Sequence, residues 1–508
     1  MKKYNKKPII LLTGLLVLFS LSIFLIPVAA YNEPKTSQGV DLTIWVTDQQ
    51  LPGVKNVTDP GGAFWSSPLS TGIDSVTVES TGGNAEIQLT NLQTLMQGGT
   101  ATSDVIGLDT IWTALFAENG WIIPLDSYLE PNEMDDYASG MVAAGTYKGS
   151  LYAYPYFMNL GILFYREDLM DLHFGAGNWA PSDFDTWEEL KDVANFILNN
   201  GSGQLTTADA DLVGYVGQLD AYEGGVVNFF EWCGSNGALD LVTSEGDVNI
   251  NTAEVEAAMD FIKALVPPQY TGVQGNLTQF YANGTLNPEN TGYNNYIIPR
   301  YGLVHDEGSS VGKWTAGESI FMRQWTFGYG SSLDAGLDFG VAALPHFAGA
   351  SGYKTSAVGG AILAIPAVTT GTARQAAVNL TKFLGDAEAQ EAELVTVSNF
   401  PALKSVYSAP PTGFEWIQNW TGQLDLTLSR PVHPSYPLIS DVVADYFSDL
   451  LSCQKSVATA IEEMETDVLD ILAGGPPLEG IPGYTIGLLI LTITGTIGLI
   501  IIAKKKHN

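Results

Sequence analysis

Few residues of this chain form a motif that could carry out catalysis. Gly308-Ser309-Ser310-Val311-Gly312 matches the GxSxG pattern of a nucleophilic serine. That pattern needs a buried strand before the serine and a helix after it, and neither His305-Asp306-Glu307 nor Lys313-Trp314 fits. HExxH, P-loop and EF-hand patterns are absent from the sequence and its five histidines are scattered. The sequence therefore favours neither metal chemistry nor a catalytic triad, and we expect no cofactor.

Asp109 and Trp112 are better candidates for a binding site. They follow Asp104–Ile106, a short segment that we expect to be a strand. Ligands of open α/β sheets collect at the carboxyl ends of the strands. A carboxylate accepts hydrogen bonds from hydroxyl groups, and an indole ring offers a flat apolar face.

Alternating strand and helix patterns must position these residues. Leu42–Val46 and Val76–Val78 are expected to be strands, and a helix with leucines at helical spacing lies between Val78 and Asp104. A helix is also predicted over Thr186–Asn199, because Thr186 and Glu189 form a capping-box pattern. The other expected elements are helices at 252–266, 373–384 and 439–472, strands at 320–322, 339–343 and 361–365, and a polar surface excursion over about 267–313. This alternation predicts an α/β protein with predominantly parallel sheets.

The charge of the chain restricts what it can bind. Its 508 residues include 55 acidic and 22 basic residues, which gives a formal net charge of -33. Seven basic residues lie at the two ends, so the region between Glu33 and Glu479 has 15 basic and 55 acidic residues and a net charge of -40. Such a region repels phosphate backbones, which excludes nucleic acid as a partner and leaves neutral or cationic ligands.

Both ends of the chain carry apolar segments. Residues 1–30 contain four lysines, an apolar run and small residues suited to cleavage after Ala30, so we expect a signal peptide. Residues 484–503 contain no charge and are long enough to form a transmembrane helix, which a linker at 473–483 joins to the folded region. The positive-inside rule makes the lysine-rich tail at 504–508 cytoplasmic and the acidic region extracellular.

Export makes two covalent modifications available to the chain. Cys233 and Cys453 could form one disulfide in an oxidising compartment, but the sequence does not place them together. Asn-x-Ser/Thr sequons become glycosylation acceptors only on an exported chain. The six sequons begin at Asn56, Asn200, Asn276, Asn283, Asn379 and Asn419.

Four segments of the chain follow one another in the order of a known family. They are Asp104–Trp112 with its continuation to Asp126, Gly149–Leu169 followed by Thr186–Leu190, Gln218–Glu231, and Gly317–Trp325 followed by Gly359-Gly360, Arg430–Val432 and Tyr436. Together they cover about residues 40–472 and resemble the extracellular solute-binding proteins of ABC sugar importers, especially the trehalose/maltose-binding group. The stretch at 274–308 is an insertion relative to that pattern.

The resemblance implies the architecture. It is a two-lobed, periplasmic-binding-protein-like α/β fold of type II, in which hinge crossings join the lobes and the ligand lies between them. Lobe one would take residues 40–156 and 359–412, and lobe two would take residues 157–358 and 413–472. Tyr154–Leu160 would form the first crossing.

The resemblance also implies the binding residues. A pyranose has an apolar C–H face and a rim of hydroxyls, so its site needs aromatic plates and planar polar groups. The implied binding residues are Asp109, Trp112, Phe157, Asn159, Tyr222, Glu223, Trp325, Phe327, Gly359, Gly360 and Arg430. The sequence departs from the pattern where Asn159 replaces a carboxylate, Phe327 replaces an aromatic hydroxyl and Ala361 replaces a tryptophan, so we expect a sugar of different size or identity.

Structural roles remain open for several of these residues. Trp112 and Trp325 could be core aromatics, and Asp109 could be a helix cap. Arg430 could be an ion-pair partner, and Tyr222-Glu223-Gly224 could be a helix N-terminus.

The expected function is that of a monomeric receptor tethered to the membrane with its binding domain outside the cell. It would capture a di- or oligosaccharide between closing lobes and deliver it to an ABC permease with a separate ATPase, without catalysis. Two alternatives remain open. An extracellular glycoside hydrolase needs only two nearby carboxylates, which this acidic chain could supply. A cell-surface adhesion protein would show no saturable response to a small ligand.

Overall fold

The structure is a computed structural model, and it describes part of the chain. The described residues are 39–48, 50–82, 85–99, 101–199, 202–206, 209, 211–243, 246–267, 281–282, 285–286, 296–350, 356–424 and 427–474. The expected signal peptide, the transmembrane segment at 484–503, the tail and the sequons at Asn200, Asn276 and Asn283 lie outside these residues. Within them, no helix combines the length and the apolar character needed to cross a membrane.

The first group of strands has the β-α-β pattern that the sequence predicts. Strand β1 (Val40–Val46) pairs in parallel with β2 (Ile73–Ser80) and with β3 (Val105–Asp109). Helix α2 (Ala85–Gln97) connects β2 to β3. Asp109 is therefore the last residue of β3, at its carboxyl end, as the sequence predicts.

Strand β6 (Ala153–Arg166) connects this group to a second one. Its residues 153–160 pair antiparallel with β12 (Ser356–Ala364), which in turn pairs antiparallel with β3. Its residues 161–166 pair antiparallel with β10 (Ser319–Trp325) and β11 (Phe339–Ala342). The change of partner falls between Leu160 and Gly161.

The prediction of predominantly parallel sheets is wrong. The principal sheet runs in the order β2-β1-β3-β12-β6-β10-β7, where β7 is Val213–Val216 and pairs in parallel with β10. Both β6 and β12 run against their neighbours, so the sheet is mixed. The remaining short strands are β4 (Thr146–Tyr147), β5 (Ser150–Leu151), β8 (Tyr281–Ala282), β9 (Thr285–Leu286), β13 (Phe400–Pro401) and β14 (Thr427–Leu428).

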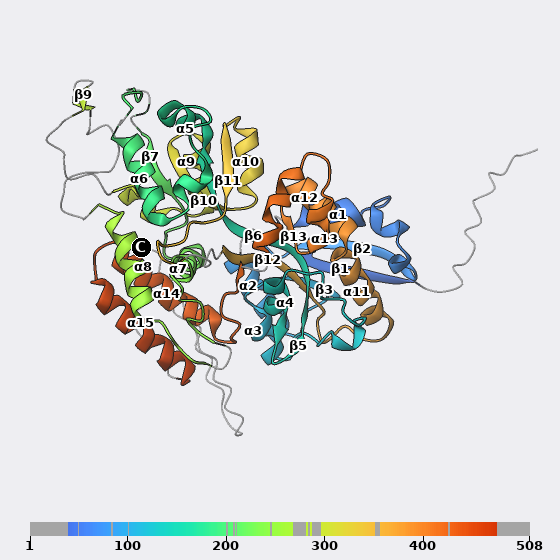
Figure 1. The fold of residues 1–508 in the computed structure, drawn as a ribbon. Coiled ribbons are helices and arrows are strands. Elements are labelled where there is room, and N and C mark those ends of the chain that lie inside the picture. The colour runs from blue at the N-terminus through green and yellow to red at the C-terminus, as the bar shows by residue number, and fades with distance from the viewer. Residues whose placement is uncertain are drawn as a thin grey trace, which may run out of the picture. The chain divides into compact units, whose positions relative to one another are not determined.

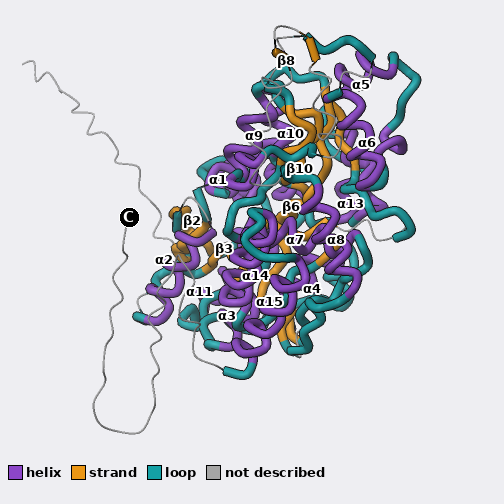
Figure 2. The backbone as a smooth tube through the Cα atoms, turned by 90° about the vertical axis from the view of Figure 1, so that its left-hand side faces the viewer, coloured by secondary structure: helices purple, strands orange, loops and turns teal. Residues whose placement is uncertain are grey.

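Helices surround the strands in both views (Figures 1 and 2). Around the first group are α1 (Leu51–Thr58), α3 (Thr113–Glu118), α4 (Ser139–Gly145), α11 (Gly371–Leu384), α12 (Ala387–Val397) and α13 (Lys404–Ser408). Around the second are α5 (Glu167–Phe174), α6 (Trp187–Leu198), α7 (Glu223–Ser235), α8 (Ala253–Ala264), α9 (Glu307–Thr315), α10 (Gly328–Asp334), α14 (Tyr436–Leu451) and α15 (Val457–Leu472). Short 3-10 helices span Ala63–Ser66, Pro68–Ser70, Asp126–Tyr128, Pro181–Phe184, Arg300–Val304 and Glu415–Gln423. Helix α14 packs on α7 and α15, and α15 packs on α8.

The helix predictions have three outcomes. The capping box is confirmed, because Thr186 Oγ1 accepts from the Glu189 amide (3.2 Å) while Glu189 Oε2 accepts from the Thr186 amide (3.0 Å). The expected polar excursion to residue 313 is wrong in part, because α9 starts at Glu307 with Asp306 as its N-cap. The helical period over 439–472 is two helices, because the chain turns after α14 and Cys453 takes a left-handed backbone conformation (φ 66°).

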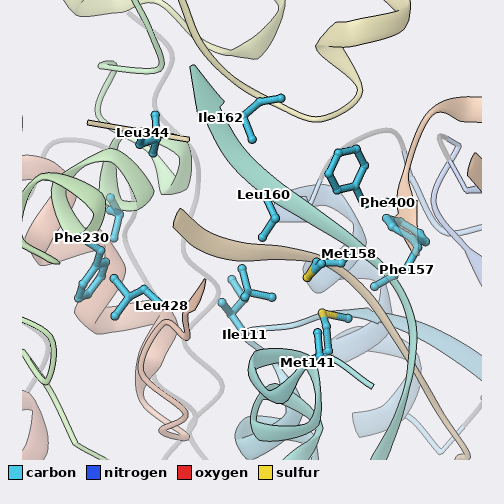
Figure 3. Packing of buried hydrophobic residues seen from close by; sticks show 14 of the residues in the cluster. Ile111, Met141, Phe157, Met158, Leu160, Ile162, Phe230, Leu344, Phe400 and Leu428 are labelled. Atoms are coloured by element: carbon cyan, nitrogen blue, oxygen red, sulfur yellow. The ribbon is translucent and has the colours of Figure 1, made fainter. Parts of the chain in front are cut away.

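Strand β6 is buried along almost its whole length, and apolar side chains line it (Figure 3). Met158, Leu160 and Ile162 are fully buried. A strand covered on both faces has a continuous apolar sequence instead of an alternating one. Asn159 and Arg166 are the two positions of β6 that are only half-buried, so Asn159 is a polar group left partly accessible in the middle of the sheet.

Candidate functional site

Neighbouring strands bring four of the expected binding residues together. In the pairing of β12 with β6, Gly359 lies opposite Asn159, and in its pairing with β3, Ala361 lies opposite Asp109. Gly360 has a φ of 110°, and a Cβ there would lie 2.3 Å from the carbonyl oxygen of Phe157. That close approach and that backbone conformation both require glycine.

Arg430 is buried at the centre of a polar cluster. Its Nη1 donates to Glu223 Oε1 (2.5 Å) and its Nη2 to Asp109 Oδ1 (3.2 Å). The same Nη2 donates to Thr110 Oγ1 (3.0 Å) and to the Val358 carbonyl (3.3 Å), whereas Nε has no partner among the described residues. Burial opposes the charge on Arg430, but the carboxylates of Asp109 and Glu223 raise its pKa above the usual value. The ion-pair role that the sequence left open for Arg430 is confirmed.

Glu223 is both the first residue of α7 and a partner of Arg430. Tyr222 is the N-cap of this helix, so the helix N-terminus expected here is confirmed. The Glu223 carboxylate also accepts from Tyr436 Oη (2.8 Å) and from Ser440 Oγ. Burial raises the pKa of Glu223, and the charge of Arg430 only partly opposes that effect. A cation from beyond β14 therefore joins the end of β3 to the start of α7.

Trp325, the last residue of β10, is half-buried and held on several sides. The guanidinium carbon of Arg323 lies 4.2 Å from the centroid of its ring. The indole Nε1 donates to Glu307 Oε1 (3.3 Å), and Glu307 Oε2 accepts from Tyr222 Oη (2.7 Å). Burial and then the charge of Glu307 raise the pKa of Tyr222, which therefore stays a neutral phenol. A Cβ on Gly359 would lie 3.0 Å from the Trp325 ring, so this glycine admits the indole beside β12.

Asn159 and Phe327 are two further expected binding residues close to Trp325. Asn159 contacts the residue after Trp325, and Phe327 follows Trp325 by two positions in the sequence. Asn159 Oδ1 accepts from Thr326 Oγ1 (2.8 Å), and Thr326 directly follows Trp325. Phe327 is half-buried and is the N-cap residue of α10. The end of β10 therefore has an indole, an amide, a carboxylate and a phenol close to one another.

Trp112 and Phe157 do not present a ring face in this structure. Trp112 is 2% exposed and Phe157 is 4% exposed, and both belong to the apolar core. Neighbouring core side chains cover both rings in this structure, and the role of Trp112 and Phe157 as stacking plates stays a prediction. Asp109 is not a helix cap, since Trp112 occupies the N-cap position of α3, although Asp109 Oδ1 accepts from the Ile111 amide (3.3 Å).

The site includes residues that sequence reasoning missed. Glu307, Thr326, Thr110 and Ser440 all contact an expected binding residue. Only Glu307 had a usable signal, because Asp306 and Ser309 have the spacing of a helix N-cap, and the structure confirms that capping box. That signal would have placed a carboxylate in the first turn of a helix.

The described residues give little support to a catalytic function. Ser310 of the GxSxG match lies inside α9 and donates to the Asp306 carbonyl (2.7 Å), so it is not on a strained turn. The carboxylates of Asp109 and Glu223 are both engaged in ion pairs with Arg430. Within the described part of the chain, no group of three or more His, Cys, Asp or Glu residues could hold a metal ion.

The structure describes both cysteines and three of the six expected glycosylation sites. Cys233 is buried, Cys453 is exposed, and both are free thiols, so the disulfide that the sequence left open does not form in this structure. Asn56 and Asn419 are exposed, and Asn379 is half-buried on α11.

Comparison with known proteins finds one protein family whose model matches this chain. The family model described as bacterial extracellular solute-binding protein matches residues 70–421, more than half of the chain. A curated relative from Deinococcus radiodurans, a probable ABC transporter-binding protein, is 29% identical over 308 residues. That alignment covers 60% of this chain and 63% of the relative, so the chain spans less than two thirds of the relative's length.

Solved structures with the same fold include sugar-binding proteins. Maltose-bound MalE3 of T. maritima has a TM-score of 0.66 at 24% identity, and the match covers 85% of this chain and 100% of that one. The cyclic alpha-maltosyl-1,6-maltose binding protein of Arthrobacter globiformis has a TM-score of 0.64 at 19% identity, with 86% and 100% covered. These similarities establish a two-lobed binding-protein fold for this chain.

Proposed function

Because the chain belongs to the family of bacterial extracellular solute-binding proteins, we propose that it captures a neutral di- or oligosaccharide of the maltose or trehalose kind. In this proposal it hands the sugar to an ABC permease that is driven by a separate ATPase, and it performs no chemistry itself. The observation that carries the proposal is the half-buried indole of Trp325 with the Glu307 carboxylate at its edge and Tyr222 beside it.

Sugar chemistry fits these groups. The indole stacks on the C–H face of a pyranose, while the carboxylate of Glu307, the amide of Asn159 and the unpartnered Nε of Arg430 supply acceptors and donors for hydroxyls. One net hydrogen bond contributes about 1 kcal/mol, and micromolar affinity needs about 8 kcal/mol. Stacking and several hydrogen bonds must therefore act together.

The proposed lobes place the site between them. Residues 40–156 and 359–412 form the first lobe, and residues 157–358 and 413–472 form the second. Asp109 belongs to the first lobe, and Glu223 belongs with Arg430 to the second. The ion pair of Asp109 with Arg430 then joins the lobes, and we expect it to break and re-form as they open and close.

The proposal includes a membrane anchor. An N-terminal signal exports the acidic region, and the apolar segment at 484–503 holds it at the outer face of the membrane as a single-pass, monomeric protein. Asn56, Asn379 and Asn419 are candidate glycosylation sites on this exported domain. Detergent-free carbonate extraction tests the anchor: the full chain should stay with the membrane, and a chain ending at residue 474 should be released.

A calorimetric titration with maltose, trehalose and maltotriose tests the binding function. We expect saturable binding of at least one sugar without release of monosaccharide. Trp325→Ala should weaken that binding by about 30-fold or more, since it removes a central aromatic contact worth roughly 2 kcal/mol. Trp179→Ala is the matched control, because Trp179 is also half-buried and its Nε1 also donates to a carboxylate, Asp171 (2.7 Å).

Two results would overturn the proposal. Hydrolysis of the sugars would favour the glycoside hydrolase, and an absence of any saturable response would favour an adhesion protein. A large loss of ligand-free stability in Trp325→Ala, compared with Trp179→Ala, would instead show that Trp325 acts as a core residue.

A further inference from the structure

We infer that Arg323 is a positioning residue, which holds the indole of Trp325 in place as the aromatic plate of the site. Arg323 and Trp325 are two residues apart on β10, so their side chains project from the same face of the strand. The guanidinium carbon lies 4.2 Å from the centroid of the indole ring, the geometry of a cation–π contact. The inference rests on the proposed function, since it assigns a role in ligand binding to a residue that would not itself touch the sugar.

The guanidinium is fixed by hydrogen bonds from all three of its nitrogen atoms. Nε donates to Glu231 Oε2 (2.7 Å) and Nη2 to Glu231 Oε1 (2.6 Å), which is a two-pronged contact of the kind that a planar fork makes. Nη1 donates to Gln218 Oε1 (2.7 Å). The side chains of Arg323 and Glu231 are 1% and 2% exposed. The cation under the indole therefore has a single orientation.

The ion pair lies where β6 exchanges its partners. A Cβ on Gly161 would lie 2.0 Å from Glu231 Oε1 and 2.4 Å from Arg323 Nη2, so the absent side chain at this position makes room for the pair. Glu231 Oε1 also accepts from the Ala357 amide of β12 (3.1 Å). Through this carboxylate the plate is connected to α7 and to both of the strands, β6 and β12, that link the two groups of the sheet.

Stability alone is a weak explanation for such a pair. Burying two charges costs several kcal/mol in desolvation, and well-packed apolar replacements of buried ion pairs are often neutral or stabilising. A cation below an indole, in contrast, orients the ring in a way that an apolar side chain does not. The geometry thus assigns the pair to the orientation of Trp325.

The test uses two variants of the full-length protein. The double variant Arg323→Met/Glu231→Gln removes both charges, so no unpaired charge stays buried. The single variant Arg323→Lys keeps the charge but loses the fork, and it serves where the double variant does not fold. Each variant, and the wild type, is also made in a Trp325→Phe background. Subtracting the emission spectrum of each protein that carries Trp325→Phe from the spectrum of its parent, which keeps the indole, isolates the emission of Trp325.

The ligand-free spectra decide the positioning role without any sugar. We expect the Trp325 emission to change in wavelength and intensity in both variants while circular dichroism stays that of the wild type. An unchanged Trp325 spectrum would overturn the inference. If the wild type binds none of the sugars tested, the proposed function fails, but this readout still stands on its own.

Maltose affinity supplies the second readout. A cation–π contact is worth about 0.5 to 2 kcal/mol, so the double variant should bind maltose roughly 2- to 30-fold more weakly than the wild type. In the Trp325→Phe background the same two substitutions should change the affinity much less, because the indole on which Arg323 acts is gone. An equal loss in both backgrounds would mean that Arg323 acts through general stability and not through Trp325.

Discussion

Replacing Arg430 by methionine tests how the polar cluster at the strand ends is held. In the wild type, Arg430 lies between Asp109 and Glu223, and its side chain is 3% exposed. Its removal leaves the half-buried Glu223, whose side chain is 20% exposed, with only the hydroxyl donors of Tyr436 and Ser440. Breaking a fully buried ion pair by removing one partner costs roughly 3 to 5 kcal/mol, and the partial exposure of Asp109 and Glu223 lowers that cost, so we expect a loss of about 3 kcal/mol or less in the free energy of unfolding at pH 8.

The loss should depend on pH because Glu223 can become neutral. Burial already raises the pKa of Glu223 in the folded protein while Arg430 is present, and the pKa should rise further once the cation is gone. A carboxyl group with a raised folded-state pKa binds a proton more tightly in the folded than in the unfolded chain. Its unfavourable contribution is absent below the unfolded pKa and grows as the pH rises through the folded pKa. Arg430→Met should therefore lose less stability at pH 5 than at pH 8.

Urea unfolding followed by tryptophan fluorescence measures both quantities. The second variant, Arg430→Met/Glu223→Gln, should recover part of the loss at pH 8, since it removes the charge that has no partner. Arg166→Met is the control, because its partner Asp168 is 40% exposed and such a pair is worth about 1 kcal/mol or less. The reasoning is refuted if Arg430→Met loses as much at pH 5 as at pH 8, or if Glu223→Gln recovers nothing.

Three further predictions concern stability. Burial raises the pKa of Glu393 to about 7, so its ionisation destabilises the folded protein increasingly as the pH rises from 5 to 8. Glu393→Gln should therefore become more stable than the wild type over this range, by up to roughly 3 kcal/mol. The amide can keep the contacts with Tyr156 and Asn399. The prediction is contradicted if urea unfolding gives the same difference in free energy between the two proteins at pH 5 and at pH 8. Gly161→Ala should lose about 1 to 3 kcal/mol in the same assay, because its Cβ would lie 2.0 Å from Glu231 Oε1, and an unchanged unfolding midpoint would exclude the close approach. The melting temperature should rise between 0.05 and 1 M NaCl, since salt screens the repulsion within a chain of net charge -33; a flat or falling trend would argue against that repulsion.

Local patterns predicted the elements that depend on local interactions. The capping box at Thr186 and the strands before Asp109 were readable because their signals lie within a few residues. The direction of strand pairing was not readable. A buried strand such as β6 has the same continuous apolar sequence whether its neighbours run parallel or antiparallel to it, and its neighbours here are 150 or more residues away along the chain.

The candidate site shows the same division between local and distant signals. Asp109 could be placed at a strand end, but its partner Arg430 is 321 residues away in sequence. Trp112 and Trp325 looked equivalent, because sequence type does not reveal which indole the folded chain covers. Only the tertiary packing makes them different, since it leaves Trp325 half-buried and places Trp112 in the core. Glu307 was missed because the polar sequence around it hid the start of α9.

The pairing of charges within the site argues for a neutral ligand. Arg430 is engaged by Asp109 and Glu223, and Arg323 is engaged by Glu231, so both arginines of the site already have carboxylate partners. A sugar phosphate or uronate would have to compete with these carboxylates for a cation and would meet Glu307 beside the indole. A neutral sugar needs no such exchange, since its hydroxyls can donate to the carboxylates and its C–H face can cover Trp325. The acidic character of the whole chain and the paired charges of the site thus both disfavour an anionic ligand, the first through the field around the protein and the second through the carboxylates that already occupy both arginines.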